Sequence, residues 1–253
     1  MLKHKITHNQ KAISVKRPKN ENALHLDNKI HNHSMSSSSK QWLSRHINDE
    51  FVKKSHQEGY ISRAAYKLTQ IEEKYKIIEK AENILDIGSA PGSWLQVVFK
   101  NKEKTNQNTT IVGIDLLELS ESFYKTKEYI AIKSNVKFSF ICGDFCDESN
   151  QEKILSLTEK SYDLILSDLS PDRSGNSRVD HIRIMSIIEN IVLFSNSNLK
   201  IGGNLFFKAF HGSELEIMTK ELKQVFKYVK YIKPPASRQE SSEIYIICLK
   251  KIR

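Results

Sequence analysis

Seven short apolar runs, separated by stretches with helical spacing, restrict the fold of this chain more than any other feature. Strands that alternate with helices of about 10 to 20 residues are typical of a layered α/β sheet whose strands are mostly parallel. Only residues 233–243 separate the last two runs, so we predict a mostly parallel seven-stranded sheet that ends in an antiparallel hairpin. The predicted strands are Asn83–Ile87, Thr110–Ile114, Val136–Ile141, Asp163–Leu166, Asn204–Phe207, Tyr228–Ile232 and Ile244–Leu249.

Residues 1–40 have the composition of a tail. They mix Lys, His, Asn and Ser without a sustained period, and they contain the run Ser36–Ser39, so little apolar surface could offset the entropy of ordering them. Helical spacing begins near residue 41, and a second helix should open at Ser62. Residues 101–109 are polar and predict a surface loop. We therefore expect a basic, disordered N-terminal extension over residues 1–40 and one domain over residues 41–253.

The charge of the chain is strongly basic. It carries 39 Lys and Arg against 30 Asp and Glu, a formal charge of +9, and residues 1–60 hold most of the excess. This balance favours a polyanionic partner such as RNA, or else a solvated lysine-rich surface, and charge alone leaves both open. Residues 1–20 contain no acid, which suits either an organelle transit peptide or an RNA-binding arm.

Several classes of protein are disfavoured by what the sequence lacks. No apolar run approaches the roughly 20 residues that a bilayer-spanning helix needs, so no membrane partner is expected. The three cysteines Cys142, Cys146 and Cys248 do not make a disulfide framework and indicate a reducing compartment. Seven of the nine histidines precede residue 57 without the spacing of a zinc site, so no metal is expected.

The strongest local motif is Asn83–Trp94, in which an apolar strand leads through a loop with Gly88 and Gly92 into a helix. Glycines allow positive φ and close approach of a ligand, and a helix start favours an anionic group. The segment is not the dinucleotide fingerprint, because Ala90 stands where a glycine is needed and Pro91 lacks an amide donor. A nicotinamide oxidoreductase is therefore disfavoured, and a plain strand-to-helix turn is the alternative for this motif alone.

Four successive predicted strands each lead to an aspartate, namely Asp86, Asp115, Asp144 and Asp168. The carboxyl ends of parallel strands meet at one sheet edge, where a carboxylate after the second strand can accept both hydroxyls of a ribose. Each aspartate alone could equally be a helix cap or a turn former. Together they predict an acidic pocket in a basic protein, which suits a cationic ligand that bears a ribose.

Seven ordered segments between residues 40 and 250 carry a family resemblance. They are Trp42–His46, Ser62–Leu68, Asp86–Trp94, Gly143–Phe145, Ser167–Pro171, Phe207–Lys208 and Ser237–Tyr245. With these segments the chain resembles the FtsJ/RrmJ family of ribose 2′-O-methyltransferases. The resemblance implies a Rossmann-like methyltransferase sheet and S-adenosylmethionine as the cofactor.

The resemblance also implies the site residues. Those around the cofactor are Asp86, Gly88, Gly92, Trp94, Asp115, Asp144 and Asp168, and the catalytic tetrad is Lys67, Asp168, Lys208 and Glu243. Methyl transfer from a sulfonium to a ribose hydroxyl needs in-line approach and removal of the hydroxyl proton. A lysine that ends a strand at the pocket edge, as Lys208 should, can take part in both.

Two positions depart from the family pattern. Ser93 replaces the second glycine before the tryptophan and is tolerated if its φ is negative, whereas Asp172 replaces an asparagine and adds a negative charge where RNA should pass. Candidates for RNA backbone contact are Arg45, Lys53, Lys54, Arg63, Arg173, Arg178 and Arg238. Each of these could instead be a solvated surface charge.

The chain most resembles the ribosomal group of the family, because it is short and lacks added domains. This implies a uridine in large-subunit ribosomal RNA as the target, the large ribosomal subunit as partner, and a monomer. Transfer RNA, a messenger cap, or a non-catalytic role in ribosome assembly stay as alternatives. Val179–Arg183 and Pro235–Glu243 resemble the mitochondrial branch, which favours a mitochondrion over a bacterial cytoplasm.

Other methyl-transfer chemistries fit less well. Ser167–Pro171 is not the Asn/Asp-Pro-Pro turn that amino-group methyltransferases use. Carbon-5 methylation of pyrimidines needs a nucleophilic cysteine, and Cys142, Cys146 and Cys248 do not suit that role.

Overall fold

The computed structural model describes residue 44 and residues 47–105, 107–132, 134–170, 175–239 and 241–253. The chain divides into two compact units, residues 1–49 and 50–253, and the architecture below is that of the second unit. The expected disordered extension, residues 1–40, lies outside the described residues. So does most of the motif Trp42–His46.

The second unit alternates helices with strands, as predicted. In chain order its elements are α3 Glu50–Glu58, α4 Ala64–Tyr75, β1 Asn83–Ile87, α5 Ser93–Lys102, β2 Thr109–Asp115, the 3-10 helix η1 Phe123–Lys125, α6 Lys127–Ile130, β3 Val136–Cys142, α7 Glu148–Ser156, β4 Tyr162–Ser167, α8 Ser177–Asn198, β5 Leu199–Phe210, α9 Ser213–Val225, β6 Phe226–Ile232 and β7 Glu243–Lys251.

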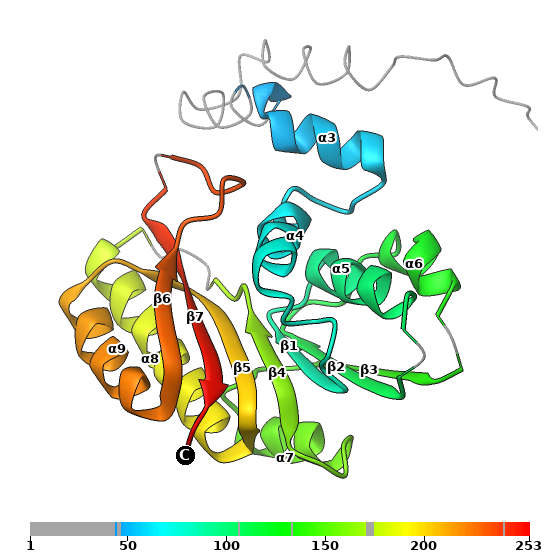
Figure 1. The fold of residues 1–253 in the computed structure, drawn as a ribbon. Helices are drawn as coiled ribbons and strands as arrows, with labels where there is room; N and C mark the ends of the chain where they lie inside the picture. The colour runs from blue at the N-terminus through cyan, green and yellow to red at the C-terminus, as the bar shows by residue number, and fades with distance from the viewer. Residues whose placement is uncertain (1–43, 45–46, 106, 133, 171–174, 240) are drawn as a thin grey trace, which may run out of the picture. The chain divides into compact units, whose positions relative to one another are not determined.

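The strands form one seven-stranded sheet in the order β3-β2-β1-β4-β5-β7-β6 (Figure 1). The pairs β3–β2, β2–β1, β1–β4 and β4–β5 are parallel, whereas β7 pairs antiparallel with both β5 and β6. The predicted mixed sheet with its antiparallel C-terminal pair is confirmed. In this hairpin β7 lies inside the sheet, between β5 and β6, and β6 is the edge strand.

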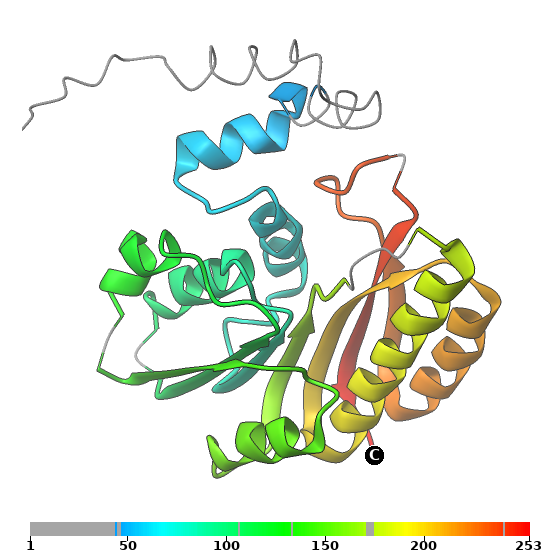
Figure 2. The ribbon, with the colours of Figure 1, turned by 180° about the vertical axis from the view of Figure 1, so that it is seen from behind.

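Helices cover both faces of the sheet and make two separate cores. One core joins the sheet to α4 and α5, and the other joins it to α7, α8 and α9. Figure 2 shows α8 and α9 along the face that lies behind the sheet in Figure 1. Ile84 points into the first core and its neighbour Leu85 into the second, as the alternation of side chains along a strand requires.

Burial on both faces explains why the strands could be recognised as apolar runs. Every residue of β1 and of β4 is buried. Central strands of parallel sheets read as continuous hydrophobic stretches for this reason. Their predicted bounds accordingly agree with the structure to within one residue.

Three local predictions differ from the structure. The polar segment 101–109 is not wholly a loop, because α5 runs on to Lys102, whose Nζ is buried and donates to the Glu79 carbonyl oxygen at 3.0 Å. The fifth strand begins five residues earlier than Asn204, with an irregular register opposite the start of β4. The second helix begins at Ala64, and Ser62 Oγ accepts a hydrogen bond from the Ala64 amide at 3.2 Å.

The topology fixes where a ligand can bind. β1 has β2 on one side and β4 on the other, so the order of the strands reverses at β1. In open α/β sheets, ligands bind outside the carboxyl ends of the strands at such a switch point. Asp86, Asp115 and Asp168 all lie at these carboxyl ends.

Candidate active site

A lysine and a glutamate from distant segments pair at this edge of the sheet. Lys67 lies in the first part of α4, and Glu243 opens β7. Lys67 Nζ is 2.9 Å from Glu243 Oε1 and 3.1 Å from Oε2. Their side chains are only 11% and 14% exposed, so water screens this attraction less than it would on the surface. The pair ties α4 to the last strand.

A second pair joins β4 to β5. Lys208, on β5, donates from Nζ to the backbone carbonyl oxygen of Asp168 at 2.6 Å. The same Nζ lies 3.1 Å from Asp168 Oδ1. The Lys208 and Asp168 side chains are 8% and 17% exposed, so this pair too is largely removed from water.

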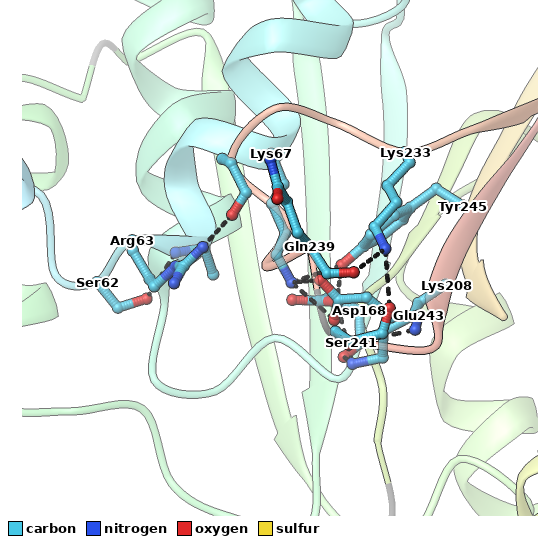
Figure 3. A network of polar contacts seen from close by, with 12 residues as sticks. Ser62, Arg63, Lys67, Asp168, Lys208, Lys233, Gln239, Ser241, Glu243 and Tyr245 are labelled. Atoms are coloured by element: carbon cyan, nitrogen blue, oxygen red, sulfur yellow. Dashed lines mark hydrogen bonds and ion pairs between the residues drawn. The ribbon is translucent and has the colours of Figure 1, made fainter. Parts of the chain in front are cut away.

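One hydroxyl connects the two pairs, as Figure 3 shows. Tyr245 Oη donates to Asp168 Oδ1 at 2.6 Å and accepts from Lys67 Nζ at 2.9 Å. The structure therefore brings all four predicted tetrad residues into one network, and it adds a fifth member that the sequence analysis did not select. A signal was present, because Tyr245 stands two residues after Glu243 and alternate residues of a strand share a face.

The network sets the ionisation of its acidic members. Burial alone would raise the pKa of Asp168, but Lys208, Lys67 and the Tyr245 hydroxyl together hold that pKa below its ordinary value. Burial, and then the carboxylates of Asp168 and Glu243, raise the pKa of Tyr245 well above its ordinary value. At neutral pH the network therefore holds an ionised Asp168 and a neutral, donating Tyr245.

The loop between β6 and β7 carries Glu243 to this position and is itself fastened. Lys233 Nζ donates to the carbonyl oxygens of Gln239 and Ser241 at 2.9 and 2.8 Å (Figure 3). Arg63, the residue before α4, holds the other side of the loop, because its guanidinium donates to the Ala236 carbonyl oxygen. Arg63, a candidate for RNA contact, thus has a structural partner.

Trp94 supports the network from the core. Its ring is 3% exposed and stacks on Phe206 at 5.4 Å between centroids, and Phe206 stacks on Tyr245 at 5.2 Å. The indole Nε1 donates to the carbonyl oxygen of Ala64 at the start of α4. Trp94 therefore positions the elements that bear Tyr245 and Lys67, although it was predicted as a cofactor contact.

The glycine loop after β1 is closely packed. Gly88 and Gly92 have φ of +80° and +110°, where a side chain is rarely accepted. A Cβ on Gly88 would lie 2.7 Å from the Leu169 backbone, and one on Gly92 would lie 2.6 Å from Phe123. Ser93 is already the first residue of α5, so this departure from the family pattern is tolerated as expected.

Two aspartates beside this loop offer acceptors for a ligand. Asp115 accepts from the Ala90 amide through Oδ2 and from the Leu117 amide through Oδ1, both at 2.9 Å, which leaves further lone pairs on each oxygen. Asp86 is fully buried, and among the described residues neither of its carboxylate oxygens has a hydrogen-bond partner. Burial, and then the charges of Asp168 and Asp115, raise the pKa of Asp86 well above its ordinary value.

The unpartnered Asp86 is the observation that tests the fit of a cofactor. A buried carboxyl group without partners is costly unless a ligand or water supplies donors. A cationic ligand with ribose hydroxyls, such as S-adenosylmethionine, supplies donors of that kind. The residues present therefore fit the cofactor that the sequence analysis expected.

The remaining predicted residues lie further out. Asp144 is exposed, and its Oδ1 accepts from the Cys146 amide at 2.8 Å in the turn after β3. Lys53 and Arg178 are exposed on α3 and α8, and Lys54 pairs with Glu58 at 3.7 Å. Arg238 is half-buried in the loop between β6 and β7, and the candidates Arg45 and Arg173, with the departure Asp172, lie outside the described residues.

Comparison with known proteins decides the family. Residues 60–251 match the family described as FtsJ-like methyltransferase. The chain belongs to this family. A Bartonella bacilliformis protein named ribosomal RNA large subunit methyltransferase E is 39% identical over 212 residues, which cover 84% of this chain and 83% of that protein. A Brucella anthropi protein of the same name is 37% identical and covers 83% of this chain and 82% of its own length.

A solved structure agrees with the fold. The crystal structure titled as a ribosomal RNA methyltransferase, putative, from Plasmodium falciparum has a TM-score of 0.60 and 30% identity. It covers 76% of this chain and 99% of that chain. The FtsJ-like protein described here is therefore a methyltransferase, and its methyl donor is S-adenosylmethionine.

The comparisons also bear on where the FtsJ-like enzyme works. Both curated relatives above are bacterial, which favours the cytoplasmic alternative over the mitochondrial prediction. Within the described residues, no helix is long and apolar enough to cross a membrane. Nor do the described histidines, cysteines and acids gather into a group that could hold a metal ion.

Proposed function

We propose that this FtsJ-like enzyme transfers a methyl group from S-adenosylmethionine to the 2′-hydroxyl of a ribose in large-subunit ribosomal RNA. The main support is the network of Lys67, Asp168, Lys208 and Glu243 at the edge where the crevice opens. The names of the two bacterial relatives support the choice of RNA. A uridine as the modified nucleotide, and a monomeric enzyme, are finer parts of the same proposal.

We assign the cofactor to the crevice between the ends of β1 and β2. Asp86 and Asp115 would accept hydrogen bonds from its ammonium group and ribose hydroxyls, with the Gly88–Gly92 loop against it. Asp144 would close the outer side, and Asp168 lies between this crevice and the tetrad. Bound there, S-adenosylmethionine supplies an electrophilic methyl group on a sulfonium that leaves as a neutral thioether.

The chain's own residues would orient and deprotonate the hydroxyl. Lys208 is held by the carbonyl and carboxylate oxygens of Asp168, so its Nζ is fixed in direction at the pocket edge. Lys208 would first lose one Nζ proton to solvent; its neutral amine would then accept a hydrogen bond from the 2′-hydroxyl in line with the methyl group and take up the hydroxyl proton as the new C–O bond forms and the sulfur–methyl bond breaks. The Lys67–Glu243 pair fixes the far side of the network and keeps Tyr245 aimed at Asp168.

The domain organisation enters the proposal as well. Residues 41–253 would form the methyltransferase domain, which is supported by the family match over residues 60–251. With a cytoplasmic enzyme, the basic extension of residues 1–40 would act as an RNA-binding arm. A mitochondrial enzyme would instead use it as a transit peptide.

The experiment that tests this proposal is single-turnover methylation with ribose methylation mapped on large-subunit RNA. Lys208→Ala should lower the rate by about 10²- to 10⁴-fold and leave cofactor affinity largely intact, with some loss of melting temperature because Asp168 loses its buried partner. Lys220→Ala, at an exposed lysine of α9, is the matched control and should behave as wild type. A Lys208→Ala rate within a few-fold of wild type would overturn the role of Lys208. If the wild-type enzyme methylated transfer RNA or capped messenger RNA and not ribosomal RNA, the assignment of ribosomal RNA as the substrate would be overturned.

A further inference from the structure

A cavity of about 360 Å³ lies where β4 and β5 begin, at the opposite end of these strands from the network of Lys67, Asp168, Lys208 and Glu243. The end of α4, the start of β5 and the end of β7 surround it. Its charged lining consists of Lys76, Lys80, Lys200, Lys250 and one acid, Asp163. All four lysines are exposed, whereas Asp163 is buried and pairs with Lys200. Lys76 Nζ also lies 3.8 Å from Glu79 Oε2 at the surface, but the lysines outnumber these two acids, so the cavity presents a net positive charge to the solvent.

Two of these lysines occupy backbone positions that suit other residues better. Lys76 and Lys250 have φ of 49° and 59°, in the left-handed region that favours glycine or asparagine. They are also the two residues outside glycine for which the described chain has positive φ. Local backbone preference thus does not explain why lysine stands at these two positions. Because both side chains line the same cavity, we infer that their positive charge has a function there.

Aromatic rings stand among the lysines. Tyr75, at the end of α4, lines the cavity and has the Nζ atoms of Lys74 and Lys230 at 5.4 and 5.7 Å from its ring centroid. On β6 the exposed Tyr228 has Lys227 Nζ at 5.6 Å from its own ring. Lysines on an edge strand also discourage strand pairing, which would account for β6 alone. That explanation does not extend to the lysines that α4, β5 and β7 contribute.

We propose that this basic and aromatic cavity binds a single-stranded segment of the RNA substrate, distant from the methylated ribose. The inference rests on the proposed function, because it takes the substrate to be RNA. Lysines that track phosphates beside rings that accept bases are the usual means of holding single strands. The volume is in the range of small-ligand sites and could take a nucleotide unit.

The distance between the two sites indicates what kind of RNA is bound. Lys67 and Tyr75 lie eight residues apart on α4, which corresponds to about 12 Å along the helix. Asp163, at the start of β4, and Asp168, just after its end, mark the two ends of that strand, about 16 Å apart. An RNA that reaches both must span at least this distance around α4 or β6. The second contact would thus select folded or long RNA over short oligonucleotides.

Charge reversal at the cavity tests the proposal. In Lys76→Glu/Lys80→Glu/Lys250→Glu, the KM for the large subunit or its naked RNA should rise tenfold or more, with kcat and cofactor affinity unchanged. The control Lys104→Glu/Lys220→Glu/Lys223→Glu makes the same change of charge at exposed lysines elsewhere and should show a much smaller effect. If the reversed variant does not fold, glutamine at the same three positions replaces it.

A binding titration separates this site from the proposed function, because it needs no catalysis. With a labelled single-stranded RNA, log affinity falls linearly with log salt concentration. This dependence should be less steep by about 2 in the cavity variant, since about three phosphate contacts are lost. Tyr75→Leu should weaken binding several-fold without changing that slope.

Three outcomes would overturn the proposal. In the first, the cavity variant matches the control in both assays while wild type still methylates ribosomal RNA, which leaves the proposed function standing. In the second, the defect appears with large subunits but not with naked RNA, which assigns the cavity to an acidic protein. In the third, Tyr75→Leu binds as wild type does, which removes the aromatic part of the site.

Discussion

Asp86 and Asp168 occupy equivalent places, at the carboxyl ends of neighbouring parallel strands, yet their surroundings are opposite. Asp168 receives Tyr245 Oη at 2.6 Å and lies 3.1 Å from Lys208 Nζ, and its pKa is lowered. Asp86 is fully buried with no partner among the described residues, and its pKa is raised by burial first and by Asp168 and Asp115 next.

The difference shows how one sheet edge can hold two kinds of site. Around Asp168 the chain supplies the positive charges itself, so that part is preorganised before any ligand arrives. Around Asp86 the described residues supply no donor, which leaves that role to a ligand or to water. In the function proposed above, the catalytic part would therefore be complete in the protein, and the cofactor part would be completed by its ligand.

Asp168→Asn is the variant with the largest expected effect, and it tests whether the charge of Asp168 is what distinguishes its surroundings from those of Asp86. The amide keeps the shape but removes the charge that fixes Lys208, so single-turnover methylation should fall by about 10³-fold. The wild-type pKa of Asp168 is lower in the folded state, so its contribution to stability is fully present above the ordinary pKa of about 4 and is lost as the pH falls from there through the lower folded-state pKa. Thermal melts should show this acid limb flattened in Asp168→Asn.

The control for Asp168→Asn is cofactor binding at pH 7, which should change much less than the rate. Equal losses in the rate and in cofactor affinity would contradict a division of this edge into two parts. A wild-type rate would contradict the assignment of Asp168 to the catalytic part.

A smaller effect is expected from Tyr245→Phe. The ring keeps its stacking on Phe206, but Asp168 loses one donor and Lys67 one acceptor. Loss of one buried hydrogen bond to a charged group corresponds to about a tenfold lower rate. Single-turnover rates over a pH series would detect it, with Tyr228→Phe on the exposed part of β6 as the control. An unchanged rate would mean that the hydroxyl is not needed to hold the tetrad.

The sequence predicted the fold well because the strands that matter are buried on both faces. β1 and β4 show as apolar runs for that reason, and the aspartates after them follow from the topology. β5 was underestimated, because its first part contains Lys200 and Gly202–Gly203 and lies at the sheet margin. No apolar pattern marks a strand in such a segment.

The tetrad was predictable from motifs, but the way in which it is held was not. Lys67 and Glu243 are separated by most of the chain, so their pairing depends on where the hairpin β6–β7 inserts. Trp94 is buried and stacks on Phe206 in the core, and its predicted contact with the cofactor stays a prediction. No sequence signal marks Asp86 as unpartnered, since this reflects where the donors of the described residues lie in three dimensions.

Asp86→Asn sharpens the comparison most directly. Cofactor affinity should fall by about tenfold, because the ligand loses a charged acceptor. The cofactor-free protein should nevertheless become more stable at pH 7, by a few degrees in melting temperature, since folding at that pH requires the raised-pKa carboxyl of Asp86 to take up a proton, whereas the amide needs none.

The sign of the pH dependence distinguishes this explanation from a general packing effect. The folded-state pKa of Asp86 is raised, so wild type has its full stability below the ordinary carboxyl pKa of about 4 and loses part of it as the pH rises towards the folded value. The gap between Asp86→Asn and wild type should therefore open between pH 4 and pH 7 and close at lower pH. Asp115→Asn is the matched control: its carboxylate already accepts two backbone amides, so it should lose cofactor affinity without any gain in stability. A gap of constant size across the pH series would show that Asp86 is not held protonated by its burial.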